Sequence, residues 1–240
     1  FFVEPSQIQG NRIVITGSDV NHIKNVLRMK PGEEIAVSNG TDGKEYRCGI
    51  EELLEEEIIC TLRFIKEDGL ELPARVTFFQ GLPKADKMEF IVQKAVELGV
   101  SRIVPYLSKN CVSRPDKTEK KVERWRKIAA EAAKQCGRGR LPEVTAVVPV
   151  AQAIAQAAES ETALFFYENE KRTGLHDALA GGVRDTVSLM VGPEGGFDPA
   201  EAKAAVDAGL QSVSLGTRIL RCETAPIAAL AAVLYAGGNM

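Results

Sequence analysis

The sequence has few of the residues that build metal sites and disulfide frameworks. It contains two histidines, His22 and His176, and five scattered cysteines with no Cys-x-x-Cys pair. Structural zinc sites usually need such closely spaced cysteines and histidines, so no metal is expected. An odd number of dispersed cysteines also argues against a disulfide framework and for reduced thiols.

Long apolar runs and known nucleotide-binding signatures are missing as well. No stretch is long enough to cross a membrane, and the first ten residues lack the regions of a signal peptide. We therefore expect a cytoplasmic protein with no membrane partner. Neither G-x-G-x-x-G nor G-x-x-x-x-G-K-[ST] occurs in the glycine-rich segments, so dinucleotide and P-loop chemistry are not supported.

Positive charge is scarce overall but concentrated in one place. The net charge is −3, which argues weakly against a nucleic-acid partner. Residues 102–140, however, hold twelve Lys and Arg against four Asp and Glu, whereas residues 51–57 hold five glutamates. A local basic zone suits contact with phosphate groups. A solvated helix face is the alternative explanation for these charges.

Residue patterns divide the chain into two domains, 1–72 and 73–240. The first contains one helical piece, 19–27, and four short β-like segments: 12–16, 34–38, 45–51 and 57–64. Strands at this spacing are typical of a small barrel. A boundary is expected at 68–73, where glycine and proline interrupt the pattern.

Beyond that boundary the pattern alternates between strand and helix. The expected strands are 75–81, 102–107, 144–148, 163–167, 186–191 and 211–215. The expected helices are 87–98, 119–136, 150–158, 175–179, 199–208 and 226–236. This alternation predicts an α/β domain with a mostly parallel sheet and helices on its faces.

Two glycine-bearing segments follow the last two predicted strands. Residues 190–201 read MVGPEGGFDPAE, and residues 215–225 read LGTRILRCETA. Open α/β sheets bind ligands at such strand ends, and glycine allows the main chain to approach a ligand closely. Asp198, Pro199 and Glu201 occupy the N-cap, N1 and N3 positions of the next helix. For a single loop, a tight turn without a ligand is the alternative.

Together these segments resemble the RsmE family of 16S ribosomal RNA uridine-N3 methyltransferases, which belong to the SPOUT superfamily. Three further segments carry the resemblance: HIKNVLRMKPGE at 22–33, KMEFIVQKAVELGV at 87–100 and KIAAEAAKQCGRGRLPEV at 127–144. The resemblance implies a PUA-like RNA-binding β-barrel at 1–72. It implies a SPOUT-type α/β domain at 73–240, with a C-terminal trefoil knot that is a rare exception to unknotted topology.

The same resemblance implies S-adenosyl-L-methionine as the cofactor, bound on the two glycine segments. Main-chain groups of such loops can bind the adenine edge while apolar side chains cover its ring. The expected cofactor-binding residues are Met190, Val191, Gly192, Glu194, Gly195, Gly196, Leu215, Gly216, Ile219 and Leu220, with Phe166 at the end of the preceding strand.

Methyl transfer to uridine N3 requires loss of the imino proton and alignment of the nitrogen with the methyl donor. We expect Arg221 to stabilise the uridine anion. Glu223 is expected to accept the proton, directly or through water, provided that its surroundings raise its pKa. In the alternative, Glu223 and Thr224 only cap the helix that opens at Pro226.

RNA contacts are expected from polar and basic residues in both domains. The candidates are His22, Arg28, Lys84, Lys87, Arg138 and Arg140. Phosphate contacts position RNA without reading its sequence, and the target base must be turned outward for methylation. For His22, a role as a helix-start cap is the alternative. The chain begins Phe1-Phe2, whereas members of the family usually carry an arginine just before this point.

The apolar C-terminal helix, 226–236, is expected either in the core of one chain or in a symmetric homodimer, which the resemblance implies. Two rival functions also remain open. A non-catalytic RNA-binding factor of ribosome assembly would keep the scaffold without the cofactor. A phosphate or nucleotide binder would be competed by ATP, whereas a methyltransferase would be competed by S-adenosylhomocysteine.

Overall fold

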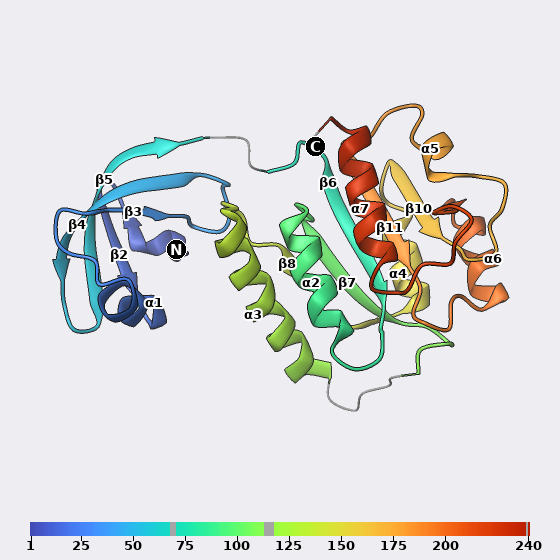
Figure 1. The fold of residues 1–240 in the computed structure, drawn as a ribbon, viewed down its shortest axis with the longest axis horizontal. Helices are drawn as coiled ribbons and strands as arrows, with labels where there is room; N and C mark the ends of the chain where they lie inside the picture. Colours follow the sequence, from blue (N-terminus) through green and yellow to red (C-terminus); the bar gives the residue numbers. More distant parts are fainter. Residues whose placement is uncertain (68–70, 113–117, 239) are drawn as a thin grey trace. The chain divides into compact units, whose positions relative to one another are not determined.

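The structure, a computed structural model, describes residues 1–67, 71–112, 118–238 and 240, and the chain folds as two compact units (Figure 1). The first unit consists of Phe1–Glu71 and Ala133–Leu141, and the second of Leu72–Ala132 and Pro142–Met240. Residues 133–141 thus pack with the first unit, although the division expected from the sequence places them in the second. Residues 68–70 of the expected boundary lie outside the described residues.

The first unit is built on a five-stranded antiparallel sheet with the strand order β1-β2-β5-β4-β3. Its elements are η1 (Pro5–Gln7), β1 (Ile8–Gln9), β2 (Arg12–Thr16), α1 (Ser18–Asn21), η2 (His22–Val26), β3 (Glu34–Val37), β4 (Glu45–Leu53) and β5 (Glu57–Lys66). Side chains alternate in and out, so that Ile13 and Ile15 of β2 are fully buried while Arg12 is exposed.

The first residues of the chain bring the two edges of this sheet together. The amide of Val3 donates to the carbonyl of Ser38, just after β3, at 2.9 Å. A few residues later, β1 pairs with β2 at the opposite edge. The expected barrel-like β-domain is therefore confirmed.

The second unit contains a seven-stranded sheet, and six helices follow one another along its described residues. Its strands are β6 (Arg75–Gly81), β7 (Arg102–Leu107), β8 (Glu143–Val144), β9 (Val148–Pro149), β10 (Thr162–Phe166), β11 (Thr186–Val191) and β12 (Gln211–Val213). The helices that follow are α2 (Lys87–Glu97), α3 (Thr118–Cys136), α4 (Val150–Ala157), α5 (Leu175–Ala178), α6 (Pro199–Asp207) and α7 (Ala225–Ala236), and α3 ends in the segment that packs with the first unit.

The strand order of this sheet creates a topological switch point. The order is β12-β10-β11-β6-β7-β8, with β9 also pairing with β7, and the paired strands run parallel. From β6 the chain builds outward to β7, β8 and β9, and it then returns to build β10, β11 and β12 on the other side. The connections after β6 and β11 therefore diverge, and open α/β sheets bind ligands at such a switch point.

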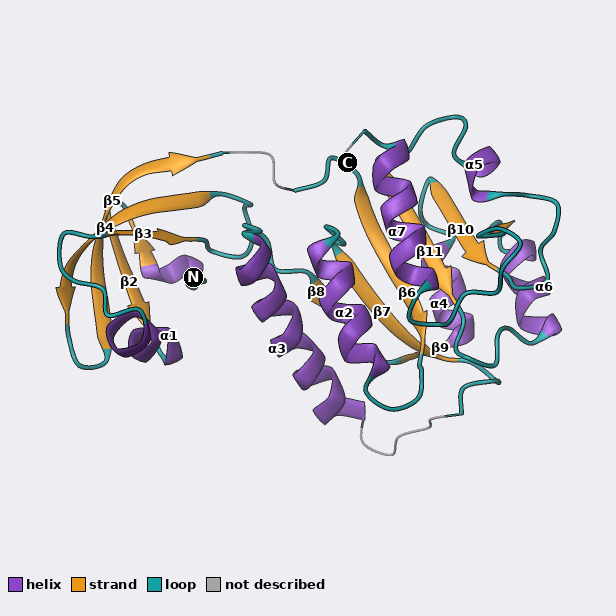
Figure 2. Cartoon of the chain, viewed as in Figure 1, coloured by secondary structure: helices purple, strands orange, loops and turns teal. Residues whose placement is uncertain are grey.

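Helices cover both faces of the parallel sheet (Figure 2). α2 packs against α7, which lies on β11, and α4 packs against α6 while lying on β6 and β7. The core beneath α4 and α6 includes Phe79, Phe165 and Met190, all of which are almost completely buried. Among the described residues, no helix combines the length and apolar character needed to cross a membrane.

Two expected elements differ in the structure. The single strand expected at 144–148 is split into β8 and β9, which pair with opposite ends of β7 and leave residues 145–147 outside the ladder. The helical piece expected at 19–27 begins as α1 and continues as the π-helical segment η2, in which the amide of Leu27 donates to the carbonyl of His22 at 2.9 Å. Arg28 follows with a left-handed φ of 55°.

Candidate functional site

The two glycine segments follow the two strands that flank β10, at the carboxyl ends of the parallel sheet. The glycine loop, residues 192–196, follows β11, and the C-terminal loop, residues 214–224, follows β12. Phe166 ends β10 between them and pairs in register with Val191 on one side and Val213 on the other. Both loops therefore start from adjacent points.

The expected helix start after the glycine loop is confirmed. The carboxylate of Asp198 accepts a hydrogen bond from the amide of Ala200 at 3.0 Å, and the amide of Asp198 donates to Glu201 at 3.1 Å. Pro199 occupies the first helical position. This reciprocal capping satisfies otherwise unpaired amides and holds the end of the loop.

Residues after β7, which are absent from the predicted site, brace the same loop. The side-chain amide of Asn110 donates to the carbonyls of Gly195 and Gly196 at 3.1 and 3.4 Å. The ammonium of Lys109 pairs with Asp198 at 2.6 Å. Their signal in the sequence is their position, since they follow a strand that ends at the same edge of the sheet as the glycine loop.

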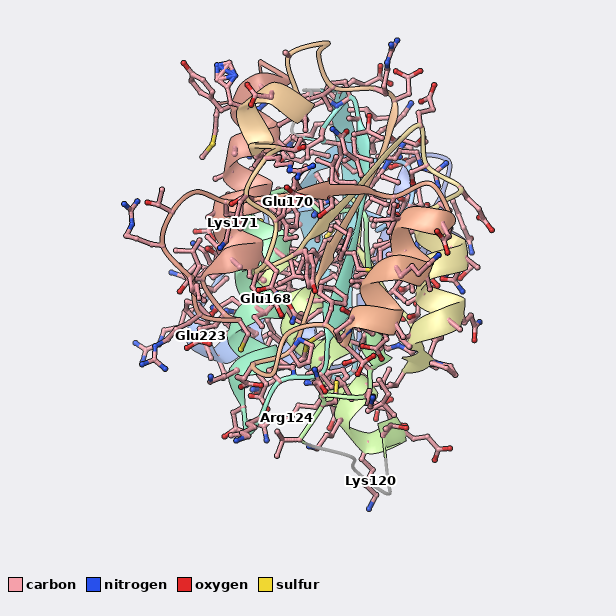
Figure 3. The ribbon with its side chains drawn as sticks, turned by 90° about the vertical axis from the view of Figure 1, so that its right-hand side faces the viewer. Lys120, Arg124, Glu168, Glu170, Lys171 and Glu223 are labelled. Carbon is pink, nitrogen blue, oxygen red and sulfur yellow. The ribbon has the colours of Figure 1, made fainter. Side chains whose placement is uncertain are left out.

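The glycines of the two loops differ in how closely other atoms pack against them. At Gly196, where φ is 65°, a Cβ would collide with the carboxylate of Glu168, and at Gly195 it would lie 2.9 Å from the carbonyl oxygen of Asn110. Figure 3 shows Glu168 on the loop that follows β10. At Gly216, where φ is 107°, a Cβ would meet nothing within 4 Å. The glycine loop is thus closely packed, whereas Gly216 faces open space.

The apolar candidates also separate into two groups. Phe166, Met190 and Val191 are buried, so their side chains are not exposed to a ligand. Ile219 is 85% exposed, and Leu215 and Leu220 are half-buried on the C-terminal loop. The second group can cover the ring of a bound ligand.

A lysine connects the two loops. The ammonium of Lys87, at the start of α2, lies 3.0 Å from Glu194 of the glycine loop and 3.1 Å from Glu223 of the C-terminal loop. The thiol of Cys222 donates to Glu223 at 3.2 Å, and the amide of Lys84 donates to Glu194 at 3.1 Å. Figure 3 shows Glu223 on the loop that precedes α7.

These contacts determine the protonation of the Lys87 cluster, which consists of Lys87, Glu194, Cys222 and Glu223. Burial alone would raise the pKa of Glu223, but hydrogen bonds from Cys222 and Lys87 outweigh it and hold the pKa below its usual value of 4.5. Glu194 is likewise lowered despite burial, through hydrogen bonds from backbone amides and from Lys87. Burial and the contact with Glu223 raise the pKa of the Cys222 thiol to about 12. The raised pKa expected for Glu223 as a base is not found.

The two predicted catalytic residues, Arg221 and Glu223, therefore differ in whether their side chains are already paired. Arg221 is exposed, and its guanidinium forms no hydrogen bond or ion pair with any of the described residues, whereas its carbonyl accepts hydrogen bonds from the amides of Thr224 and Ala225. Glu223 is occupied by Lys87 and Cys222. Thr224 is the N-cap of α7 but makes no side-chain capping bond, so the capping alternative is not observed.

The predicted RNA contacts of the first unit differ in exposure. His22, Arg28 and Arg140 are exposed, whereas the side chain of Arg138 is only 5% exposed and pairs with Glu71 at 2.6 Å. Buried in this way, Arg138 holds its turn in place and does not offer its guanidinium to phosphates. α1 begins at Ser18, so His22 does not cap a helix start.

Metal and disulfide chemistry find no site in the described part of the chain. No group of three or more His, Cys, Asp or Glu side chains there could hold a metal ion. All five cysteines are free, and Cys48 and Cys60 are buried in the core of the first unit. Burial raises the pKa of these two thiols to about 11 and about 12.

Comparison with known proteins agrees with this geometry. The RNA methyltransferase domain family matches residues 70–234, and the RNA methyltransferase PUA domain family matches residues 15–63. The curated ribosomal RNA small subunit methyltransferase E of Bacillus subtilis is 36% identical over 228 residues, which cover 92% of this chain and 89% of that protein.

Solved structures agree as well. The methyltransferase E of Neisseria gonorrhoeae, crystallised with S-adenosyl methionine, superposes with a TM-score of 0.86 at 33% identity and covers 98% of this chain and 96% of its own. A putative methyltransferase of Legionella pneumophila, also bound to that cofactor, gives a TM-score of 0.84 at 30% identity with the same coverage. The expected PUA-like domain followed by a SPOUT-type domain is confirmed, and the chain belongs to the ribosomal RNA small subunit methyltransferase E family.

Proposed function

We propose that this protein transfers the methyl group of S-adenosyl-L-methionine to N3 of a uridine in 16S ribosomal RNA. The observation that carries the proposal is the junction of two glycine-bearing loops and Arg221 at the carboxyl ends of β11 and β12. The names of the relatives support ribosomal RNA of the small subunit as the substrate. The uridine and its N3 atom follow from the resemblance to the family.

The two loops have the features that such a cofactor needs. The main chain of Gly216 faces open space, and Leu215, Ile219 and Leu220 offer apolar cover. Next to the glycine loop, the buried Gln80 donates to the carbonyl of Gly192 at 3.3 Å, while its own Oε1 has no hydrogen-bond partner among the described residues. A buried acceptor without a donor is costly, and a bound ligand or water would relieve that cost.

We assign the cofactor to the residues that line this junction. They are Phe166, Met190, Val191, Gly192, Glu194, Gly195, Gly196, Leu215, Gly216, Ile219 and Leu220. When bound, the cofactor supplies the electrophilic methyl group. Glu194 contributes by shaping the loop, because its carboxylate is already engaged by the amide of Lys84 and the ammonium of Lys87.

The chemistry on the uridine is assigned to Arg221 and Glu223. The free guanidinium of Arg221 stabilises the negative charge that develops when N3 loses its proton. Glu223 accepts that proton, directly or through water. A general base works best with a pKa near the operating pH, and the hydrogen bonds from Cys222 and Lys87 hold the pKa of Glu223 below its usual value, so Glu223 is a weak base in this arrangement.

RNA positioning is assigned to exposed residues of both units. His22, Arg28 and Arg140 of the first unit and Lys84 of the second have solvent-facing side chains that can reach RNA. Arg138 in the first unit and Lys87 in the second each support their own unit's contacts indirectly, since each is held in an ion pair. A cytoplasmic location follows from this proposal because the substrate is part of the ribosome.

We also propose a symmetric homodimer through α7, and a C-terminal trefoil knot as in other SPOUT proteins. One side of α7 is buried on β11 and α2, but Ala228 and Ala231 are only half-buried, and Tyr235 is 76% exposed. Small residues beside an exposed aromatic ring suit close packing against a second copy. Sedimentation equilibrium distinguishes the dimer from a monomer.

Calorimetric titration of the purified protein with S-adenosyl-L-methionine tests the function most directly. We expect binding, competition by S-adenosylhomocysteine and no competition by ATP. Gly195→Trp should not bind, because Asn110 leaves no room at that position. Mass spectrometry of small-subunit RNA incubated with the protein then checks methylation. Absence of cofactor binding by the wild-type protein would refute the proposal.

A further inference from the structure

The ion pairs of Lys87 join three segments that are far apart in the sequence. Lys87 begins α2, Glu194 lies in the glycine loop and Glu223 lies in the C-terminal loop. Both carboxylates are within 3.1 Å of the same nitrogen atom. One ammonium group thus pairs with both loops, beside the direct contact between Glu194 and the thiol of Cys222.

The connection between β6 and α2 positions the ammonium group of Lys87. The amide of Lys84 donates to both carboxylate oxygens of Glu194, at 3.1 and 3.3 Å. Ala85 adopts a left-handed φ of 52°, which is unfavourable for a residue other than glycine. A Cβ at Gly81 would lie 2.6 Å from Cδ of Pro193, so this connection and the glycine loop are in close contact.

Charge makes the cluster sensitive to the loss of Lys87. Two ionised carboxylates face one ammonium, and the thiol of Cys222 stays neutral because its pKa is raised to about 12. The three charged side chains are half-buried, with exposed fractions of 24% to 31%. Without Lys87 the carboxylates would repel each other, and the loops that carry them would move apart.

We propose that Lys87 is a positioning residue for cofactor binding, which locks the C-terminal loop against the glycine loop in the arrangement that receives S-adenosyl-L-methionine. The ligand named here rests on the proposed function. This role differs from the RNA contact that the sequence predicts for Lys87. A mutation of Lys87 should therefore weaken binding of the cofactor instead of binding of the RNA.

Lys94 provides a matched control on the same helix. It pairs with Glu97 at 2.8 Å, and its exposed fraction of 34% is close to the 31% of Lys87, but among the described residues no ion pair joins it to either loop. In calorimetric titrations we expect Lys87→Met to weaken binding of the cofactor about tenfold or more, because the charge that pairs with both carboxylates is lost. Lys94→Met should bind like wild type.

The conservative variant and the kinetics separate positioning from general destabilisation. Lys87→Arg should recover most of the affinity, since a guanidinium can bridge two carboxylates. In methylation assays Lys87→Met should raise KM for the cofactor more than it lowers kcat. Wild-type affinity in Lys87→Met, or an equal loss in Lys94→Met, would overturn the inference.

Hydrogen exchange measured without any ligand tests the loop clamp, by which we mean the ion pairs of Lys87 with Glu194 and Glu223, separately from the proposed function. We expect the amides of residues 215–224 to exchange faster in Lys87→Met than in wild type, and unchanged rates would count against the clamp. If wild-type protein bound no cofactor while these amides responded as expected, the proposed function would fail and the loop clamp would stand. Glu223→Gln, which removes only one of the two pairs, should give an intermediate response.

Discussion

The hydroxyl of Tyr106 donates a hydrogen bond of 2.9 Å to the carbonyl oxygen of Val191, and both residues are buried. Tyr106 lies on β7 and Val191 ends β11, with β6 between these strands in the sheet. Burial raises the pKa of Tyr106 well above its usual value, so the hydroxyl remains a donor at ordinary pH. The bond anchors the point at which the glycine loop begins.

Replacing Tyr106 with phenylalanine should therefore destabilise the protein and the cofactor site together. The carbonyl of Val191 would be left buried without its donor, which costs about 1 to 3 kcal/mol in the free energy of unfolding. Urea denaturation measures this cost, and calorimetry should show weaker cofactor binding. Tyr235→Phe is the control, because Tyr235 is 76% exposed. Equal stability of the two variants would contradict the prediction.

A methyl group at Gly196 should disturb cofactor binding by displacing Glu168. Gly196→Ala places a Cβ against the carboxylate of Glu168 at a φ of 65°. Gly182→Ala is matched, since it has a φ of 84° but no atom within 4 Å of the added carbon. Both variants should lose similar stability from backbone strain, about 1 kcal/mol. Calorimetry should show a loss of cofactor affinity in Gly196→Ala alone. A similar loss in both variants would mean that displacement of Glu168 is not the cause.

Arg138 and Arg140 should separate stability from RNA binding. Arg138→Met breaks the buried pair with Glu71 and should lower the free energy of unfolding by about 3 to 5 kcal/mol. Arg140→Ala should change stability little, because its side chain is exposed. It should weaken RNA binding and reduce the salt dependence of log K by about one unit, measured by fluorescence anisotropy at several salt concentrations. The reverse pattern would place the RNA contact at Arg138.

Acid should unfold the protein partly through the cluster around Lys87. The pKa values of Glu194 and Glu223 lie below 4.5 in the folded protein, so their stabilising effect is present above that pH. It is lost as the pH falls through the lowered values, where the folded carboxylates take up protons. Urea denaturation from about pH 7 to pH 3 should show a steeper decline for wild type than for Glu194→Gln. Parallel curves would mean that Glu194 contributes nothing to acid stability.

Much of the fold was predictable because its signals act between near neighbours. Alternating burial marks β2, and the capping box of Asp198 and Glu201 marks the start of α6. Where the structure differs from the predicted elements, pairing with residues far away in the sequence determines the outcome. β8 and β9 exist as separate strands because β7 offers them pairing at its two ends.

The candidate site was predictable only in part for the same reason. Glycine content and position after a strand point to the two loops, but not to the residues that brace them. Asn110 and Lys87 reach the loops from other elements, and no local pattern marks either as a partner of Gly195 or Glu223. Likewise, a basic residue in a turn resembles a phosphate contact until its burial is known, as Arg138 illustrates.

The sequence by itself determined the two-domain plan, the parallel sheet and the location of the ligand loops, since periodicity, caps and turn residues depend on neighbours along the chain. Tertiary structure alone decided which charges are free and which are paired. Lys87 is paired with both loops because the order of strands in the sheet, not their order in the chain, determines which loops meet, while the guanidinium of Arg221 finds no partner among the described residues.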